Sequence, residues 1–244
     1  MRFPDPYALR NESPKETVLF AASQLTGQQE LQEDYFLNFN DECFVLADGV
    51  SSLPHGETAA KFACETAVWA YKHIRQHRYY WLDKKLFMKR IFRSTNLAIW
   101  QKHREEGFTD GLATTLLVLM VGPKHYWLGS AGDSSAWLSR GGDIRKLTRD
   151  KPAFQAIPGQ ALGIRRLGLV PEFVTGTFSH GDVLLLATDG AGDYITGSDI
   201  QASVSRTGST TDGVTDAVVS LLTAAHTNGS EENMTAVIVK RVVT

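Results

Sequence analysis

The chain has 244 residues, which is long enough to bury a substantial hydrophobic core, and its 43% hydrophobic and 21% charged residues are ordinary for a globular protein. Its net charge of -2 excludes a global electrostatic field that would recruit nucleic acid or an anionic membrane. The two cysteines, Cys43 and Cys64, are too few for a zinc site or a disulfide framework, so we expect two buried free thiols.

The amino-terminal sequence and the lengths of the apolar runs bear on targeting and membrane insertion. The amino-terminal residues lack an apolar signal core, and no run approaches the roughly eighteen apolar residues that span a membrane. We therefore expect a cytoplasmic enzyme or binding protein with no membrane or nucleic-acid partner. Residues 1–16 contain three prolines and should form a loose arm. Residues 17–244 contain no repeat or linker, which favours a single domain.

Hydrophobic periodicity predicts the secondary structure in chain order. The first half should contain strands at 17–23, 35–38 and 43–47, a turn at 40–42, and helices at about 56–74 and 82–105. The apolar face of the second helix should comprise Leu86, Phe87, Ile91, Leu97 and Ala98. The second half should contain strands at 114–121, 125–130, 136–139, 174–178, 183–187 and 235–242, and a helix at 214–225 capped by Thr211 or Asp212.

The order of these elements indicates the fold class. Strands, two helices, further strands, one helix and a last strand favour an α+β fold with two packed antiparallel sheets and helices outside, a layered α-β-β-α sandwich. Residues 150–171 are rich in proline and glycine and should be mostly irregular.

Acidic residues stand at the ends of apolar, strand-like runs. They are Glu33, Asp34, Asp48, Asp133, Asp189 and Glu232. Asp-Gly is first of all a turn dipeptide, and we expect Asp110 and Asp212 to be no more than that. Asp48 and Asp189 differ because each follows a buried apolar run, where an unpaired carboxylate is costly to desolvate. A cation would offset this cost, so the pattern predicts a Mg²⁺ or Mn²⁺ site at one rim of a sheet, where such ions could drive phosphoryl hydrolysis.

The segments that carry these acids resemble the bacterial form of the type 2C metal-dependent protein serine/threonine phosphatases. The matching segments, in the family's order, are residues 32–35 (Gln-Glu-Asp-Tyr), 47–60, 111–116, 132–150, 181–190 and 232–239. The resemblance covers about residues 17–242. It implies hydrolysis of phosphoserine or phosphothreonine on a protein substrate by a metal-activated water, with a kinase opposing the reaction.

The resemblance also implies a set of site residues. Two Mn²⁺ or Mg²⁺ ions would be held by four catalytic carboxylates and one backbone carbonyl: Asp34, Asp48, Asp189, Glu232 and Gly49. A third, weaker ion is implied at Asp133, Asp189 and Asp193. Glu33 would accept hydrogen bonds from bound water, and Asn233 would orient its neighbours.

Several positions depart from the family pattern. The family usually has an arginine that grips the phosphate where this chain has Gln29, and a neutral amide cannot form a charged bidentate clamp. Other donors near the motif ends are Arg149, Lys151, Arg165 and Arg166, although ordinary surface charge is the better explanation for each of them. Glu232 replaces an aspartate, and Val50-Ser51-Ser52 replaces a glycine-containing turn. His55 is a candidate proton donor to the leaving group.

Two further functional hypotheses stay open at this point. Gln29 and Glu232 favour a catalytically weak phosphoprotein-binding module that retains the phosphatase fold. The segment that corresponds to the family's mobile flap, near residues 150–171, is short, which would leave the metal site open and does not exclude a small phosphorylated metabolite as substrate. The number of acids favours the enzyme, because a binding module gains nothing from packing them together.

Overall fold

The structure is a computed structural model that describes residues 16–76, 83–105, 107–108, 110–149 and 161–243. Its strands form two five-stranded antiparallel sheets. Sheet 1 contains, in spatial order, β1 (Glu16–Leu25), β10 (Met234–Val243), β9 (Val183–Ala187), β6 (Ser135–Arg140) and β7 (Asp143–Lys146). Sheet 2 contains β2 (Asp34–Phe39), β3 (Cys43–Asp48), β4 (Leu116–Val121), β5 (His125–Ala131) and β8 (Glu172–Thr177).

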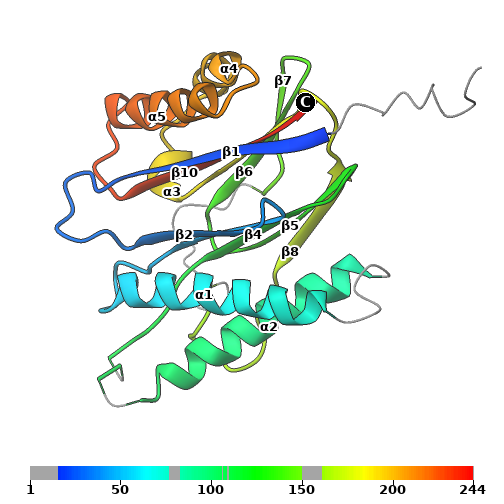
Figure 1. Ribbon diagram of the computed structural model, residues 1–244. Coiled ribbons are helices and arrows are strands. Elements are labelled where there is room, and N and C mark those ends of the chain that lie inside the picture. The colour runs from blue at the N-terminus through cyan, green and yellow to red at the C-terminus, as the bar shows by residue number, and fades with distance from the viewer. Residues whose placement is uncertain (1–15, 77–82, 106, 109, 150–160, 244) are drawn as a thin grey trace, which may run out of the picture.

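Helices cover the outer face of each sheet. They are α1 (Gly56–Arg75), α2 (Lys84–Lys102), α3 (Asp189–Gly192), α4 (Gly197–Arg206) and α5 (Thr211–Thr227). The long helices α1 and α2 lie against sheet 2, whereas α4 and α5 lie against sheet 1 (Figure 1). The predicted α-β-β-α sandwich is therefore confirmed. Within the described part of the chain, no helix is long and apolar enough to cross a membrane.

In β3 apolar residues do not alternate with polar ones, because both faces of the strand are buried. Successive side chains of a strand point to opposite faces, and here both faces are covered. Phe44 and Leu46 pack in the core between the two sheets, while Cys43, Val45 and Ala47 pack under the helices. The cysteine prediction is confirmed, since Cys43 and Cys64 are both buried and free. The strand is thus fixed on both sides and ends rigidly at Asp48.

The sequence prediction of helices needs three corrections. α2 ends at Lys102, and its buried face comprises Phe87, Met88, Ile91, Phe92, Thr95, Asn96 and Ile99. Leu86, expected in that face, is 47% exposed. The N-cap of α5 is Thr210, whose hydroxyl accepts a hydrogen bond from the Gly213 amide, and not Thr211 or Asp212. The short helix α3 and the largely polar helix α4 were not predicted.

The strand predictions are confirmed with small shifts in their bounds. β7, a four-residue strand without a buried side chain, was missed because polar residues give it no hydrophobic signal. Thr114 lies outside β4 and makes isolated bridges instead. The predicted arm of residues 1–16 lies outside the described residues except for Glu16, which begins β1. The short flap is described only from residue 161 onward, and the division into an arm and one domain stays a prediction.

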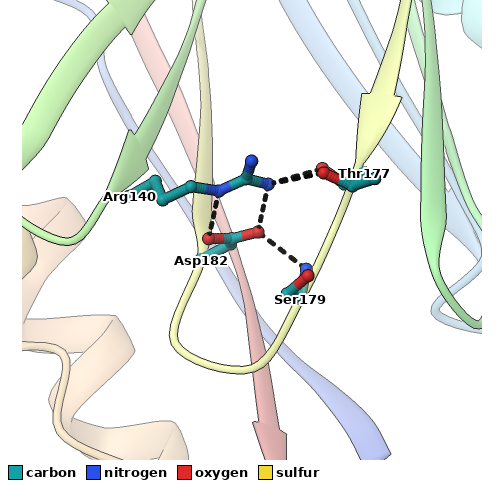
Figure 2. A network of polar contacts seen from close by, with 4 residues as sticks. All are labelled: Arg140, Thr177, Ser179 and Asp182. Carbon is teal, nitrogen blue, oxygen red and sulfur yellow. Dashed lines mark hydrogen bonds and ion pairs between the residues drawn. The ribbon is translucent and has the colours of Figure 1, made fainter.

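An ion pair fastens the connection between β8 and β9 to sheet 1 (Figure 2). Asp182 is 3% exposed and accepts hydrogen bonds from the Arg140 guanidinium at 2.9 and 2.6 Å and from the Ser179 amide at 2.7 Å. Arg140 also donates to the Thr177 carbonyl at 2.8 Å. The buried carboxylate is thereby satisfied on both oxygens, at the end of the sandwich where β6, β8 and β9 meet.

We expect Asp182→Ala to destabilise the fold without removing any metal-site residue. The substitution leaves the Ser179 amide and the Arg140 guanidinium without their acceptor, which should cost about 2–3 kcal/mol of unfolding free energy. Thermal or urea unfolding measures this cost. Asp143→Ala, on the exposed side of β7, is the matched control. Equal stability of the two variants would show that the ion pair contributes nothing.

Candidate metal centre

Strand ends from both sheets bring carboxylates together at one rim of the sandwich. Asp48 ends β3, Asp189 follows β9, and Asp133 lies in the connection between β5 and β6. One carboxylate oxygen of each lies within 4.8 Å of the others. Three acids separated by up to 141 positions in the sequence, from Asp48 to Asp189, thus form a cluster, which we call the acidic triad.

Asp34 lies beside this triad and is buried. It is the partner of Asp48 in the antiparallel register of β2 and β3, and it is 3% exposed. Its Oδ2 accepts hydrogen bonds from the hydroxyls of Thr188 at 2.9 Å and Thr235 at 2.7 Å. Its Oδ1 has no hydrogen-bond partner although it is buried. A buried, unsatisfied carboxylate oxygen is unfavourable unless a cation lies beside it.

The loop after Asp48 returns very close to its starting point. A Cβ atom on Gly49 would lie 2.4 Å from the backbone of Gly56, where α1 begins, so only glycine permits this approach. A Cβ atom on Gly56 would in turn lie 2.8 Å from the Glu33 carboxylate. Both glycines therefore hold the Gly49 backbone and the Glu33 side chain near the rim.

Polar side chains that directly precede the strands β10, β4 and β6 fix the backbone of these segments. The Asn233 amide oxygen accepts a hydrogen bond from the Glu33 amide at 2.7 Å, and its nitrogen donates to the Thr26 carbonyl at 2.8 Å. The Thr115 hydroxyl accepts from the Asp48 amide at 3.0 Å and lies 3.2 Å from the Ser134 hydroxyl, next to Asp133. Asn233 thus joins the backbone at Glu33 to that at Thr26, and its role as an orienting residue of the site stays a prediction.

Glu232 and Asp193 are two further expected ligands that lie outside the triad. Glu232 is an exposed residue, but its carboxylate is partly buried. This partial burial and the negative charges of Asp189, Asp193 and Asp133 raise the pKa of Glu232, so its carboxylate lies near enough to be repelled by these three. Asp193 is exposed and follows α3, where its amide donates to the Asp189 carbonyl at 2.9 Å. Both residues therefore flank the triad from the side of sheet 1.

The sequence reasoning missed Thr188 and Thr235, the two donors to Asp34. Thr188 directly precedes Asp189 in an apolar run, and Thr235 follows Asn233 by two positions. The Thr235 amide also donates to the Thr188 hydroxyl at 3.0 Å, which links β9 to β10 at this point. A threonine at the end of a buried run and next to an acid is a signal that could have revealed Thr188, because a buried hydroxyl needs a partner. Thr235 has no acidic neighbour in the sequence and gives no such signal.

The residues considered as hydrogen-bond donors to the phosphate lie in several separate segments of the chain. Gln29 is exposed in the loop between β1 and β2, next to Gln28, whose amide donates to the Glu231 carbonyl at 2.8 Å. Arg165 and Arg166 are exposed in the segment after residue 161, Arg149 is exposed, and Lys151 lies outside the described residues. His55 has a positive φ of 67° and packs edge-on against Phe108.

The electrostatics of the acids fit a divalent cation. Burial raises the pKa of Asp34 to about 7, against the lowering effect of its two threonine donors. Burial and the charges of Asp189, Asp34 and Asp133 raise the pKa of Asp48 well above its usual range. Without a cation, burial and mutual repulsion therefore favour the protonated form of both carboxylates. Hard carboxylate oxygens that converge in this way are the ligands that Mg²⁺ and Mn²⁺ prefer, so the residues fit such ions.

We expect the stabilisation by Mn²⁺ to grow with pH. The pKa of Asp34 is near 4 in the unfolded chain and about 7 in the metal-free fold. Its protonation therefore stabilises the metal-free fold fully below about pH 4, and this contribution is lost as the pH rises through about 7. Mn²⁺ must displace the proton. The rise in melting temperature on adding Mn²⁺ should be larger at about pH 8 than at about pH 5. Asp34→Asn should flatten this difference, and an equal rise at both pH values would contradict the account.

We also expect Thr188→Val to weaken metal binding. Valine keeps the shape of threonine but removes the donor to Asp34 and the acceptor for the Thr235 amide. Loss of a residue that orients a metal ligand typically lowers metal affinity about tenfold to hundredfold. Calorimetric titration with Mn²⁺ measures the change. Thr215→Val is the control, since that hydroxyl donates only to the Thr211 carbonyl within α5, and unchanged affinity in Thr188→Val would refute the role.

Comparison with known proteins identifies the family. The family model described as protein phosphatase 2C matches residues 23–240. The protein phosphatase PhpP of Streptococcus pneumoniae is 25% identical over 241 residues, covering 88% of this chain and 92% of that protein.

Solved structures share the fold. The serine/threonine phosphatase Stp1 of Staphylococcus aureus has a TM-score of 0.77 at 20% identity, covering 92% of this chain and 95% of its own. The catalytic domain of the phosphatase PstP, solved with two manganese ions, has a TM-score of 0.75 at 20% identity, covering 93% and 100%. With the family model matching most of its length and an acidic rim suited to divalent cations, this chain belongs to the protein phosphatase 2C family of metal-dependent protein phosphatases.

Proposed function

We propose that this phosphatase removes phosphate from phosphoserine and phosphothreonine of a protein substrate at the acidic rim, with Asp34, Asp48, Asp189 and Glu232 as its catalytic residues. The observation that carries the proposal is the convergence of the acidic triad, within 4.8 Å, at the meeting point of the two sheets. Such a cluster has no structural purpose without cations, because like charges repel and desolvation is costly.

Asp48 is the central ligand of the proposed site. Its carboxylate faces Asp34 across the β2–β3 ladder and belongs to the triad with Asp189, so it is placed to touch cations on both sides. Its own backbone is held by Thr114 and Thr115, whose hydroxyl and amide donate to the Asp48 carbonyl at 2.7 and 2.8 Å. This bonding fixes the strand end before any ligand arrives, which favours a preorganised site.

The bound ions would supply an acidified water and neutralise the charge of the phosphoryl oxygens. The protein residues around the ions position the metal ligands and exclude water from them. Thr188 and Thr235 hold Asp34 by its Oδ2, and its buried Oδ1 has no hydrogen-bond partner among the described residues. Glu33, held by Asn233 and placed against Gly56, is available to accept a hydrogen bond from water. Asp133, Asp189 and Asp193 would hold a third, weaker ion.

The relatives support the choice of metal and substrate class. PstP was solved with two manganese ions, and the bacterial relatives PhpP and Stp1 are named as protein or serine/threonine phosphatases. Mn²⁺ or Mg²⁺ is therefore the proposed cofactor, and a phosphorylated protein is the proposed substrate. An opposing kinase and a cytoplasmic location remain predictions from the sequence alone.

A binding module without efficient catalysis is the second candidate. Gln29 supports it, because an exposed neutral amide stands where the family usually grips phosphate with arginine. Glu232 supports it as well, since a longer and exposed side chain changes the reach to a cation. The triad argues against it, because Asp48, Asp133 and Asp189 keep the arrangement that catalysis needs.

We expect Asp48→Asn to abolish turnover of a phosphothreonine peptide in Mn²⁺, whereas Asp110→Asn and Asp212→Asn should leave it near normal. The reason is that Asp48 belongs to the triad, while the other two Asp-Gly aspartates are exposed, Asp110 in a loop and Asp212 in the first turn of α5. Release of inorganic phosphate with Mn²⁺, Mg²⁺ or EDTA measures activity. Turnover that survives exhaustive treatment with EDTA would exclude the two-metal mechanism, and equal loss in Asp110→Asn would contradict the assignment of Asp48.

A further inference from the structure

Asn96 on α2 is a buried polar residue whose side chain bonds a distant segment. It is 3% exposed, and its amide nitrogen donates to the carbonyls of Arg165 at 2.9 Å and Arg166 at 3.2 Å. Its amide oxygen accepts a hydrogen bond from the Gly163 amide at 3.0 Å. A buried amide is unfavourable unless it is hydrogen-bonded, and here the bonds join residues 67 to 70 positions apart. Asn96 therefore fixes the backbone of residues 163–166.

The same segment is attached to the loop of the metal centre. Leu162 exchanges two backbone hydrogen bonds with Thr114, of 3.3 and 2.8 Å, and Thr114 also bridges Gly49. Leu162 thus stands two strand spacings from Gly49, or about 10 Å. Gly163 has a positive φ of 91°, and a Cβ atom there would lie 2.3 Å from the Leu112 carbonyl oxygen. The segment therefore packs closely against the backbone of Leu112 and Thr114.

Residues 163–166 end in two exposed arginines. The Arg166 guanidinium lies 5.5 Å from the ring of Trp100, and the Arg104 guanidinium lies 5.0 Å from the same ring. Within the described part of the chain, no carboxylate lies within ion-pair distance of Arg104, Arg165 or Arg166. Guanidinium groups without a carboxylate partner attract anionic groups and bind carboxylates or phosphates in a bidentate manner. The Leu162–Thr114–Gly49 bridges bring the start of the segment that carries Arg165 and Arg166 to about 10 Å from the Gly49 loop of the metal centre.

We propose that Asn96 is a positioning residue for substrate recognition: it holds residues 163–166 so that Arg165 and Arg166 bind acidic side chains that flank the scissile phosphate. The inference rests on the proposed function and deepens it by naming the substrate class, phosphoproteins with acidic residues near the phosphorylated position. It also provides a source of positive charge at a rim where Gln29 offers none.

A purely structural role for Asn96 makes a different prediction. Loss of a structural contact would lower stability and reduce kcat for every substrate, because the Thr114 bridge and the Gly49 loop would loosen together. A positioning role affects ground-state binding of the charged peptide, so it raises KM and spares kcat. A small substrate that cannot reach the arginines, p-nitrophenyl phosphate, separates the two roles further.

The experiment compares three substrates in Mn²⁺: a phosphothreonine peptide with acidic flanks, the same peptide with neutral flanks, and p-nitrophenyl phosphate. The variants are Asn96→Ala, Arg166→Gln and Arg166→Lys. Thr95→Val is the matched control for Asn96, since Thr95 is its buried neighbour and its hydroxyl has no hydrogen-bond partner. Arg93→Gln is the control for Arg166, because it removes an exposed arginine from α2.

Asn96→Ala and Arg166→Gln should each raise KM for the acidic peptide about tenfold, as expected for loss of a charge-assisted hydrogen bond. Neither should change kcat or the turnover of p-nitrophenyl phosphate. Arg166→Lys, which keeps the charge but loses the bidentate geometry, should give a KM between those of Arg166→Gln and the wild type, and both controls should behave as the wild type. If Arg166→Gln leaves the preference for acidic flanks intact, or if the wild type has no such preference, the inference is wrong even though the phosphatase function stands. Absence of turnover with all three substrates would instead contradict the proposed function.

Discussion

The burial of negative charge at one rim of the sandwich is the constraint on which the rest of the structure depends. Asp34 is enclosed by β9 and β10 with one oxygen unsatisfied, and Asp48 lies between it and Asp189. Such an arrangement costs free energy in the metal-free fold, as the raised pKa values of Asp34 and Asp48 indicate. The close Gly49–Gly56 contact and the two threonine donors maintain it despite this cost. Site and fold are therefore coupled through the strand ends.

Two sheets are needed to assemble this rim. Sheet 2 supplies Asp34 and Asp48 from adjacent strands, and sheet 1 supplies Asp189 at the end of β9. Asp133 comes from the crossing between the sheets, where Gly132 is so close to Thr115 that a Cβ atom would lie 2.4 Å away. Rigid packing between the sheets, with Phe44, Leu186 and Val237 in the shared core, holds the two halves of the site at a constant distance.

The site residues that could be predicted are those that differ in polarity from their immediate neighbours in the sequence. Asp48 and Asp189 are recognisable because each interrupts a run of buried residues, and the runs themselves predicted β3 and β9. Thr188 and Thr235 were missed because a threonine suits a strand whether or not it bonds a carboxylate. β7 was missed because its residues are mostly polar. α4 was missed because it is short and has few apolar residues, and it depends on a capping box formed by Thr196 and Asp199. The link from Asn96 to residues 163–166 could not be predicted, since it joins segments far apart.

The central claim is that the acidic triad and Asp34 bind divalent cations at the rim between the sheets. Diffraction from crystals grown with Mn²⁺, recorded at the manganese absorption edge, tests it most directly, because anomalous difference peaks locate the ions without assumptions about activity. The account predicts two strong peaks within coordination distance of the carboxylates of Asp34, Asp48 and Asp189, and a weaker peak near Asp133. Crystals with no peak at these four residues, or with peaks only at other surface acids, would contradict it.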